Sequence, residues 1–240
     1  MRAACQDPLG TRLGLRAFGP VLMTHWPRGT ALLRASVALL ACSAMAAQAT
    51  GLEALEAFIK NTRSGRAQFV QQATSPPKEG QTARVRNSSG SLEFVRPNRF
   101  RFVFKKPLEQ TIVADGQTLW LYDVDLAQAT ARKQTQALGA TPAALIASAT
   151  DVRALELDFE LSNAATADGQ DWVLARPRAK DSGLQSVRIG FKGTVLTTLE
   201  ILDSFGQRSV MQFTQFEANP ALDNALFQFK PPAGVDVLRQ

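Results

Sequence analysis

The segment GSLEFVRPNRFRFVFKKPLEQ, residues 90–110, is the stretch of this chain that says most about its fold. Its second half places phenylalanines at positions 100, 102 and 104, and cationic residues at positions 99, 101 and 105. Side chains on a β-strand point alternately to opposite faces, so this pattern predicts a strand with one aromatic and one largely cationic face. The aromatic face then either packs into the protein's own core or is kept for an apolar ligand.

The same period of two continues through most of the chain on both sides of this segment. Asp115-Gly116 lies between two such runs and is the strongest hairpin signal. Short runs separated by turn residues predict an antiparallel sheet of roughly ten strands, curved or barrel-like. The predicted strands are residues 66–73, 83–95 (one or two strands), 99–105, 110–114, 118–124, 126–133, 154–162, 170–177, 184–192, 195–203 and 208–216.

Two segments have helical rather than strand patterning. GLEALEAFIKNTRSG, from residue 51, places Leu52, Leu55, Phe58 and Ile59 on one stripe, and Gly65 is expected to end that helix. In QALGATPAALIASATD, residues 136–151, a threonine and a proline begin a short helix over 143–147. Two short helices can cover only part of so large a sheet.

The first 49 residues have the pattern of an export signal, with a preferred start at Met23 and an upstream extension before it. Basic residues precede a short apolar core, and small residues then offer cleavage sites that place the mature start near Ala47 or Thr50. We therefore expect residues 1–49 to be removed and residues 50–240 to form one domain. An alternative is acylation at Cys42, although the large Leu40 fits a lipoprotein cleavage site poorly.

Removing this leader changes the charge and the available chemistry. Five of the 27 basic residues and one of the 21 acidic residues precede residue 50, which leaves 22 against 20 and a net charge of +2. The high isoelectric point therefore gives no support for nucleic-acid binding. The only histidine, His25, and both cysteines, Cys5 and Cys42, also lie in the leader. Residues 50–240 thus lack the side chains for a His or Cys metal site, a Ser-His relay or a thiol nucleophile, and we expect no metal, cofactor or catalytic residue.

A set of specific motifs occurs in a fixed order along the chain. An Arg-Pro pair ends one strand, an aromatic-alternating strand follows, and a Pro-containing turn leads to a further strand, Asp-Gly and LWLY. TPAALIA at 141–147 and FQFKPPAGVDV at 227–237 complete the set. Together they resemble the outer-membrane lipoprotein carrier family, LolA, over about residues 52–237. The resemblance implies an incomplete, half-open antiparallel β-barrel of about 10–11 strands, covered by an α-helical lid.

The resemblance also implies a function and partners. Such proteins are monomeric periplasmic chaperones without enzymatic activity. They take triacylated lipoproteins from an inner-membrane LolCDE-type ABC transporter and pass them to the outer-membrane receptor LolB. A carrier of this kind makes physical sense, because each exposed CH₂ group of an acyl chain costs about 0.8 kcal/mol in water.

The resemblance assigns roles to six residues. Arg96 corresponds to an arginine that bonds to backbone near the lid and holds it closed. Phe100, Phe102 and Ile112 match positions that line the acyl-chain cavity, and Leu145 and Ile146 match lid residues that face it. The lid departs from the family pattern at Ala143-Ala144, where bulkier apolar residues are common, so its seal and its transfer properties are not carried over.

Alternatives remain open on the residues alone. The Phe stripe could be ordinary core, as we expect for Phe104, and Arg96 an ordinary surface cation. Either Trp120 and Tyr122 or Leu119 and Leu121 could face the cavity. There are two competing functions. One is an anchored receptor of the LolB type, lipidated at Cys42. The other is a hydrolase that uses Asp115, Asp123 and Asp125, but no acid–base constellation beyond these turn aspartates supports it.

Overall fold

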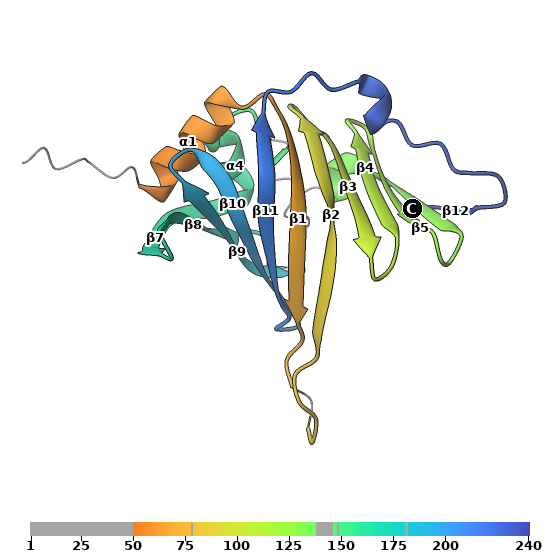
Figure 1. Ribbon diagram of the computed structural model, residues 1–240, viewed down its shortest axis with the longest axis horizontal. Coiled ribbons are helices and arrows are strands. Elements are labelled where there is room, and N and C mark those ends of the chain that lie inside the picture. Colours follow the sequence, from red (N-terminus) through yellow and green to blue (C-terminus); the bar gives the residue numbers. More distant parts are fainter. Residues whose placement is uncertain (1–49, 78, 138–145, 148, 181) are drawn as a thin grey trace, which may run out of the picture. The chain divides into compact units, whose positions relative to one another are not determined.

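The structure is a computed structural model, and it describes residues 50–77, 79–137, 146–147, 149–180 and 182–240 (Figure 1). The predicted leader, with Met23 and Cys42, lies outside the described residues, as do Ala143, Ala144 and Leu145 of the predicted lid. No described helix is long and apolar enough to cross a membrane.

One large sheet organises residues 50–240. Its strands follow the spatial order β12-β6-β5-β4-β3-β2-β1-β11-β10-β9-β8-β7, and β12 and β7 form its two separate edges (Figure 1). The strands are β1 Ser64–Thr74, β2 Val85–Val95, β3 Arg99–Lys106, β4 Gln110–Asp115, β5 Thr118–Asp123, β6 Gln128–Lys133, β7 Phe159–Ala167, β8 Gln170–Pro177, β9 Leu184–Lys192, β10 Val195–Asp203, β11 Arg208–Ala218 and β12 Asp236–Arg239. The helices are α1 Gly51–Asn61, α2 Gln134–Ala137, α4 Val152–Asp158 and the 3₁₀-helix η2 Asn224–Phe227.

The prediction of a mainly β fold with an open antiparallel sheet and helical cover is confirmed. The sheet has twelve strands rather than 10–11, because Asp236–Arg239 adds a short edge strand that pairs in parallel with β6. Residues 83–95 contribute one strand, β2, and not two.

Two predicted boundaries were wrong. Residues 154–158 were expected in a strand, but they belong to α4, whose first turn is capped by the Asp151 carboxylate accepting from Ala154 N at 2.8 Å. Gly65 does not end α1, which stops at Asn61; it lies inside β1. A Cβ at Gly65 would lie 2.4 Å from the Phe94 ring and 3.2 Å from the Phe216 ring, so close ring packing explains this glycine.

The β1–β5 region defines the two faces of the sheet. Phe100 of β3 lies opposite Phe94 of β2, and Phe102 lies opposite Leu92 and Ile112. We call the face that carries these residues the inner face. The outer face carries the alternating residues, such as Arg101 and Trp120.

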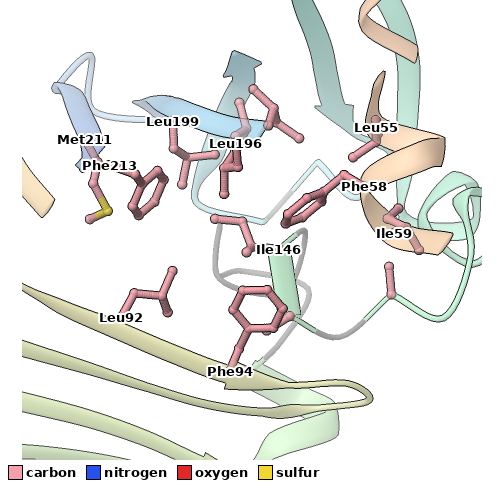
Figure 2. Close-up of a cluster of buried hydrophobic side chains, with 14 of the residues drawn as sticks. Leu55, Phe58, Ile59, Leu92, Phe94, Ile146, Leu196, Leu199, Met211 and Phe213 are labelled. Carbon is pink, nitrogen blue, oxygen red and sulfur yellow. The ribbon is translucent and has the colours of Figure 1, made fainter. Parts of the chain in front are cut away.

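The inner face holds the hydrophobic core. Leu55, Phe58 and Ile59 of α1 pack into the same buried cluster as Leu92 and Phe94 of β2. Figure 2 shows Ile146, from the segment between α2 and α4, among these side chains and those of β10 and β11 (Leu196, Leu199, Met211 and Phe213). The helices therefore cover the inner face, as expected for an amphipathic helix on a one-sided apolar sheet.

Candidate functional site

Arg96 lies in the turn between β2 and β3 and is buried, with only 7% of its surface exposed. Its Nε donates to the carbonyl of Thr62, directly after α1, at 2.9 Å. Its Nη1 donates to the carbonyl of Ala149 at 3.0 Å. One guanidinium thus joins the end of α1, the β2–β3 turn and the segment that follows Ile146-Ala147.

The surroundings of Arg96 are aromatic rather than acidic. Its guanidinium carbon lies 5.2 Å from the ring centre of Phe58 and 5.3 Å from that of Phe94. Burial, with a smaller contribution from Arg63, lowers the pKa of Arg96 to about 10, so the group is still charged at neutral pH. Cation–π contacts and two charge-assisted hydrogen bonds offset part of the cost of burying this charge.

Backbone and side-chain bonds tie the same turn to two other segments. Asn98 N donates to the carbonyl of Ala147 at 3.2 Å, which attaches the described part of the predicted lid to the turn. Gln134 is buried; its Nε2 donates to the Asn98 carbonyl at 2.6 Å, and its Oε1 accepts from Gly116 N at 2.8 Å. Neither Gln134 nor Asn98 was predicted from the sequence. For Asn98, the Arg-Pro-Asn sequence offered a local turn signal. For Gln134, no local sequence pattern indicated a role.

The residues predicted to line a cavity lie on the inner face. Phe100 is fully buried, Phe102 is 5% exposed, and Ile112 is half-buried against the same cluster. Ile146 is 2% exposed and packs into the cluster as well (Figure 2). The inner face is therefore filled by the protein's own side chains around these positions.

Aromatic residues of β1 and β3, the two strands that flank β2, form a continuous row. Ring centres are 6.1 Å apart for Phe100 and Phe102, 6.0 Å for Phe102 and Phe69, and 5.1 Å for Phe69 and Phe104. Phe104, expected to be core near its strand end, is half-buried and contacts the cluster. The row therefore leads from the Arg96 turn toward the opposite end of the strands.

The register of β5 decides which of its side chains face inward. Leu119 and Leu121 pair with Ala114 and Ile112 and so lie on the inner face, where Leu119 packs against the core. Trp120 and Tyr122 lie on the outer face. Their ring centres are 5.3 and 5.4 Å from that of Phe229, so the C-terminal segment covers them.

Two of the three aspartates considered for hydrolysis, Asp115 and Asp123, serve turns. The Asp115 carboxylate accepts from Gln117 N and Thr118 N at 2.7 Å each, and Asp123 accepts from Leu126 N at 3.1 Å. Carboxylates with such partners stabilise local turns, and this accounts for their positions without a role in acid–base chemistry.

Comparison with known proteins agrees with this fold and these motifs. A family model described as outer membrane lipoprotein carrier protein LolA matches residues 60–230. The chain belongs to the LolA family. The family resemblance inferred from the sequence is thereby confirmed.

Several LolA relatives are similar over most of their length. An outer-membrane lipoprotein carrier protein from Albidiferax ferrireducens is 60% identical over 205 residues, which cover 84% of this chain and 96% of the relative. Relatives with the same description from Leptothrix cholodnii and Methylibium petroleiphilum are 51% and 49% identical, with 85% and 86% of this chain and 93% and 98% of the relatives covered.

Proposed function

We propose that this LolA-family protein is a periplasmic carrier of triacylated lipoproteins. In this proposal it accepts lipoproteins from a LolCDE-type ABC transporter at the inner membrane and delivers them to the receptor LolB at the outer membrane, acting as a monomer. The membership of the LolA family carries the proposal, since the curated relatives are named as outer-membrane lipoprotein carriers. Residues 23–49 serve as the export signal, and residues 1–22 are an extension upstream of the start at Met23.

Acyl chains bind, in this proposal, on the inner face beside Phe100, Phe102 and Ile112. That face is filled by Ile146 and its neighbours, so the acyl chains must displace the lid segment. Burial of apolar chain surface on the inner face offsets the loss of lid contacts at about 25 cal/mol per Å². Phe100 and Phe102 then contact acyl chains in place of Ile146.

Arg96 is the latch of this lid. It donates to Ala149 O, directly after the lid segment, and to Thr62 O, directly after α1, and so ties the lid segment to that helix. Net hydrogen-bond contributions of about 1–3 kcal/mol are strong enough to favour closure and weak enough for a bound acyl chain to overcome. A backbone carbonyl is also an acceptor that Arg96 can release and regain without a chemical step.

The test is release of a lipoprotein from membranes. Protein purified from cells that express the full chain is added to spheroplasts, and the supernatant is blotted for a triacylated lipoprotein. We expect release that depends on the added protein, together with co-purification of the two. No release, with the protein itself membrane-bound and labelled by palmitate, would overturn the proposal in favour of a LolB-type anchored receptor.

A further inference from the structure

A second polar region lies at the end of the inner face that is remote from Arg96. Gln71 and Ala73 follow Phe69 along β1 at every second residue, so all three share the inner face. The register pairs Gln71 with Ser88 and Met211, and Ala73 with Arg86 and Ser209. Below the aromatic row, the inner face therefore changes from apolar to polar.

These residues line a cavity of about 250 Å³, which we call the distal pocket. Phe104 forms part of its wall, and the ring of Phe104 contacts Phe69 in the aromatic row. The volume is below the roughly 300–1,000 Å³ of sites that bury a whole drug-sized ligand, so the distal pocket suits one part of a larger molecule. The polar residues of its wall are Gln71, Arg86, Ser88, Lys106, Gln110, Asp123, Gln207 and Ser209.

The pocket is rich in hydrogen-bond donors. Amide, hydroxyl, guanidinium and ammonium groups line it, against one carboxylate, Asp123. Neither Arg86 nor Lys106 forms an ion pair with another described residue. Such a wall favours a ligand with several acceptor oxygens, such as ester and amide carbonyls.

Gln71 favours a ligand that also carries a hydrogen-bond donor. Its Oε1 is buried and accepts no hydrogen bond within the part of the chain that the structure describes. A buried acceptor left without a partner costs about 1–3 kcal/mol, so rotation of the Gln71 amide toward an N–H group of a ligand in the distal pocket would be favoured. Phosphodiester and fatty-acid carboxylate groups have no donor at neutral pH, whereas an acylated peptide amino terminus has an amide N–H beside its ester carbonyls.

We propose that the distal pocket binds the ester- and amide-bearing head group of an acylated peptide, with its acyl chains along the aromatic row. This inference rests on the proposed carrier function and adds to it the direction in which the ligand lies. The acyl chains run from Phe104 past Phe69 and Phe102 toward Phe100, and the lid and Arg96 cover their far end. The peptide part of the cargo leaves at the distal end of the sheet, where the β1–β2 connection projects (Figure 1).

The experiment compares three probes on immobilised protein purified from cells expressing the full chain. The probes are a synthetic triacylated lipopeptide, palmitate and the hydrocarbon dye diphenylhexatriene, which has no polar head. Gln71→Leu and Arg86→Gln should each weaken lipopeptide binding about five- to tenfold, the effect of losing one or two hydrogen bonds. Dye binding should not change. Gln72→Leu is the matched control, since Gln72 is the next residue of β1 and points to the other face.

The outcomes separate the two proposals. If the unmodified protein binds neither the lipopeptide nor the dye, the carrier function itself is wrong. If it binds both, and Gln71→Leu and Arg86→Gln bind the lipopeptide as tightly as the unmodified protein does, only the head-group assignment is wrong. The head-group assignment is also overturned if the variants lose affinity for the dye and the lipopeptide equally. The same holds if Arg86→Gln weakens the binding of palmitate alone.

Discussion

At the scale of single residues, Arg96 shows how one side chain can join three segments. A lysine could not replace it, because one ammonium group cannot direct two fixed, planar donors toward Thr62 and Ala149. The charge tolerates burial because two aromatic faces and two carbonyls surround it. A charged side chain buried in this way, without an acidic partner, is unusual for an arginine.

Arg96→Leu should keep the fold and loosen the lid. The change leaves the carbonyls of Thr62 and Ala149 without this donor, while Leu still packs between Phe58 and Phe94. We expect hydrogen exchange at Asn98 N to accelerate roughly tenfold or more, as loss of about 1.5–3 kcal/mol of local stabilisation implies. Handover of lipoprotein to the receptor should slow as well.

Arg99→Leu is the control, because Arg99 lies after the same turn but on the outer face, where it donates to Asn224 Oδ1 and lies over the Phe227 ring. It should leave both exchange and handover unchanged. Handover at the normal rate in the Arg96→Leu variant would exclude the latch role.

Glu93 makes stability depend on pH. Burial raises the pKa of this carboxyl above its ordinary value of about 4.3, with Arg101, Arg66 and Lys105 acting in the opposite direction. The folded protein therefore holds the proton more tightly than the unfolded chain. The resulting stabilisation is full below the ordinary pKa and is lost as the pH rises through the raised pKa.

Glu93→Gln should therefore stabilise the protein at pH 7 and have less effect near pH 4. Thermal unfolding of both proteins between pH 4 and 7 measures this. An equal difference in melting temperature at every pH would show that the effect of Glu93 is one of packing and not of charge. Glu217→Gln, which removes an exposed carboxylate from β11, is the control.

At the scale of elements, the strand pairs β1–β2 and β2–β3 position the whole site. They align Phe69, Leu92 and Phe102 on one face and set Arg96 in the turn beyond them. In that register, the backbone of β3 at Val103 lies very close to Gly90 of β2. A Cβ there would lie 1.9 Å from the Val103 carbonyl oxygen and 2.8 Å from the Phe69 ring.

Gly90→Ala should consequently shift β2 against β3 and destabilise the protein by about 2–4 kcal/mol, in the range of an overpacked core. Urea unfolding measures this. Gly193→Ala is the comparison: it has open space around it but a φ of +59°, and should cost only about 1 kcal/mol. A smaller loss for Gly90→Ala than for Gly193→Ala would show that the backbone at Gly90 adapts readily.

At the scale of the whole domain, an open sheet leaves its inner face to be covered by something else. In this structure α1 and the segment at Ile146 cover it (Figure 2), together with Leu155 of α4. In the proposed carrier function, a cover made partly of a short segment, held by a few hydrogen bonds, leaves while the sheet remains intact. A carrier needs a cover that detaches separately from the sheet, because its ligand must enter and leave without unfolding the protein.

Locking the lid segment tests whether it must move. Residues 98 and 147 approach closely, since Asn98 N donates to Ala147 O, and residues 50–240 contain no cysteine to interfere. The Asn98→Cys/Ala147→Cys variant, once oxidised, should lose at least tenfold in lipopeptide affinity and regain it on reduction. Each single cysteine variant is a control. Unchanged affinity in the oxidised, disulfide-bonded protein would mean that acyl chains bind without movement of this segment.

Much of this architecture could be predicted because it depends on local patterns. Period-two alternation indicated almost every strand, and Asp115-Gly116 marked its hairpin correctly. The failures lay where local patterns were ambiguous or short. Residues 154–158 carry apolar residues at alternate positions, but the Asp151 cap makes them helical, and Asp236–Arg239 is a strand only because the edge of β6 is free to pair.

The sequence alone determined the fold class, the family and the candidate residues, because alternation and turn chemistry are properties of neighbouring positions. Only the tertiary structure decided which pair of β5 faces inward, what Arg96 bonds, that Gln134 supports the same turn, and that a polar pocket ends the aromatic row. Those features join residues far apart in the chain, from Thr62 to Ala149 and from Gln71 to Ser209. Their contacts depend on strand register and on the cover of the inner face, which no local sequence pattern specifies.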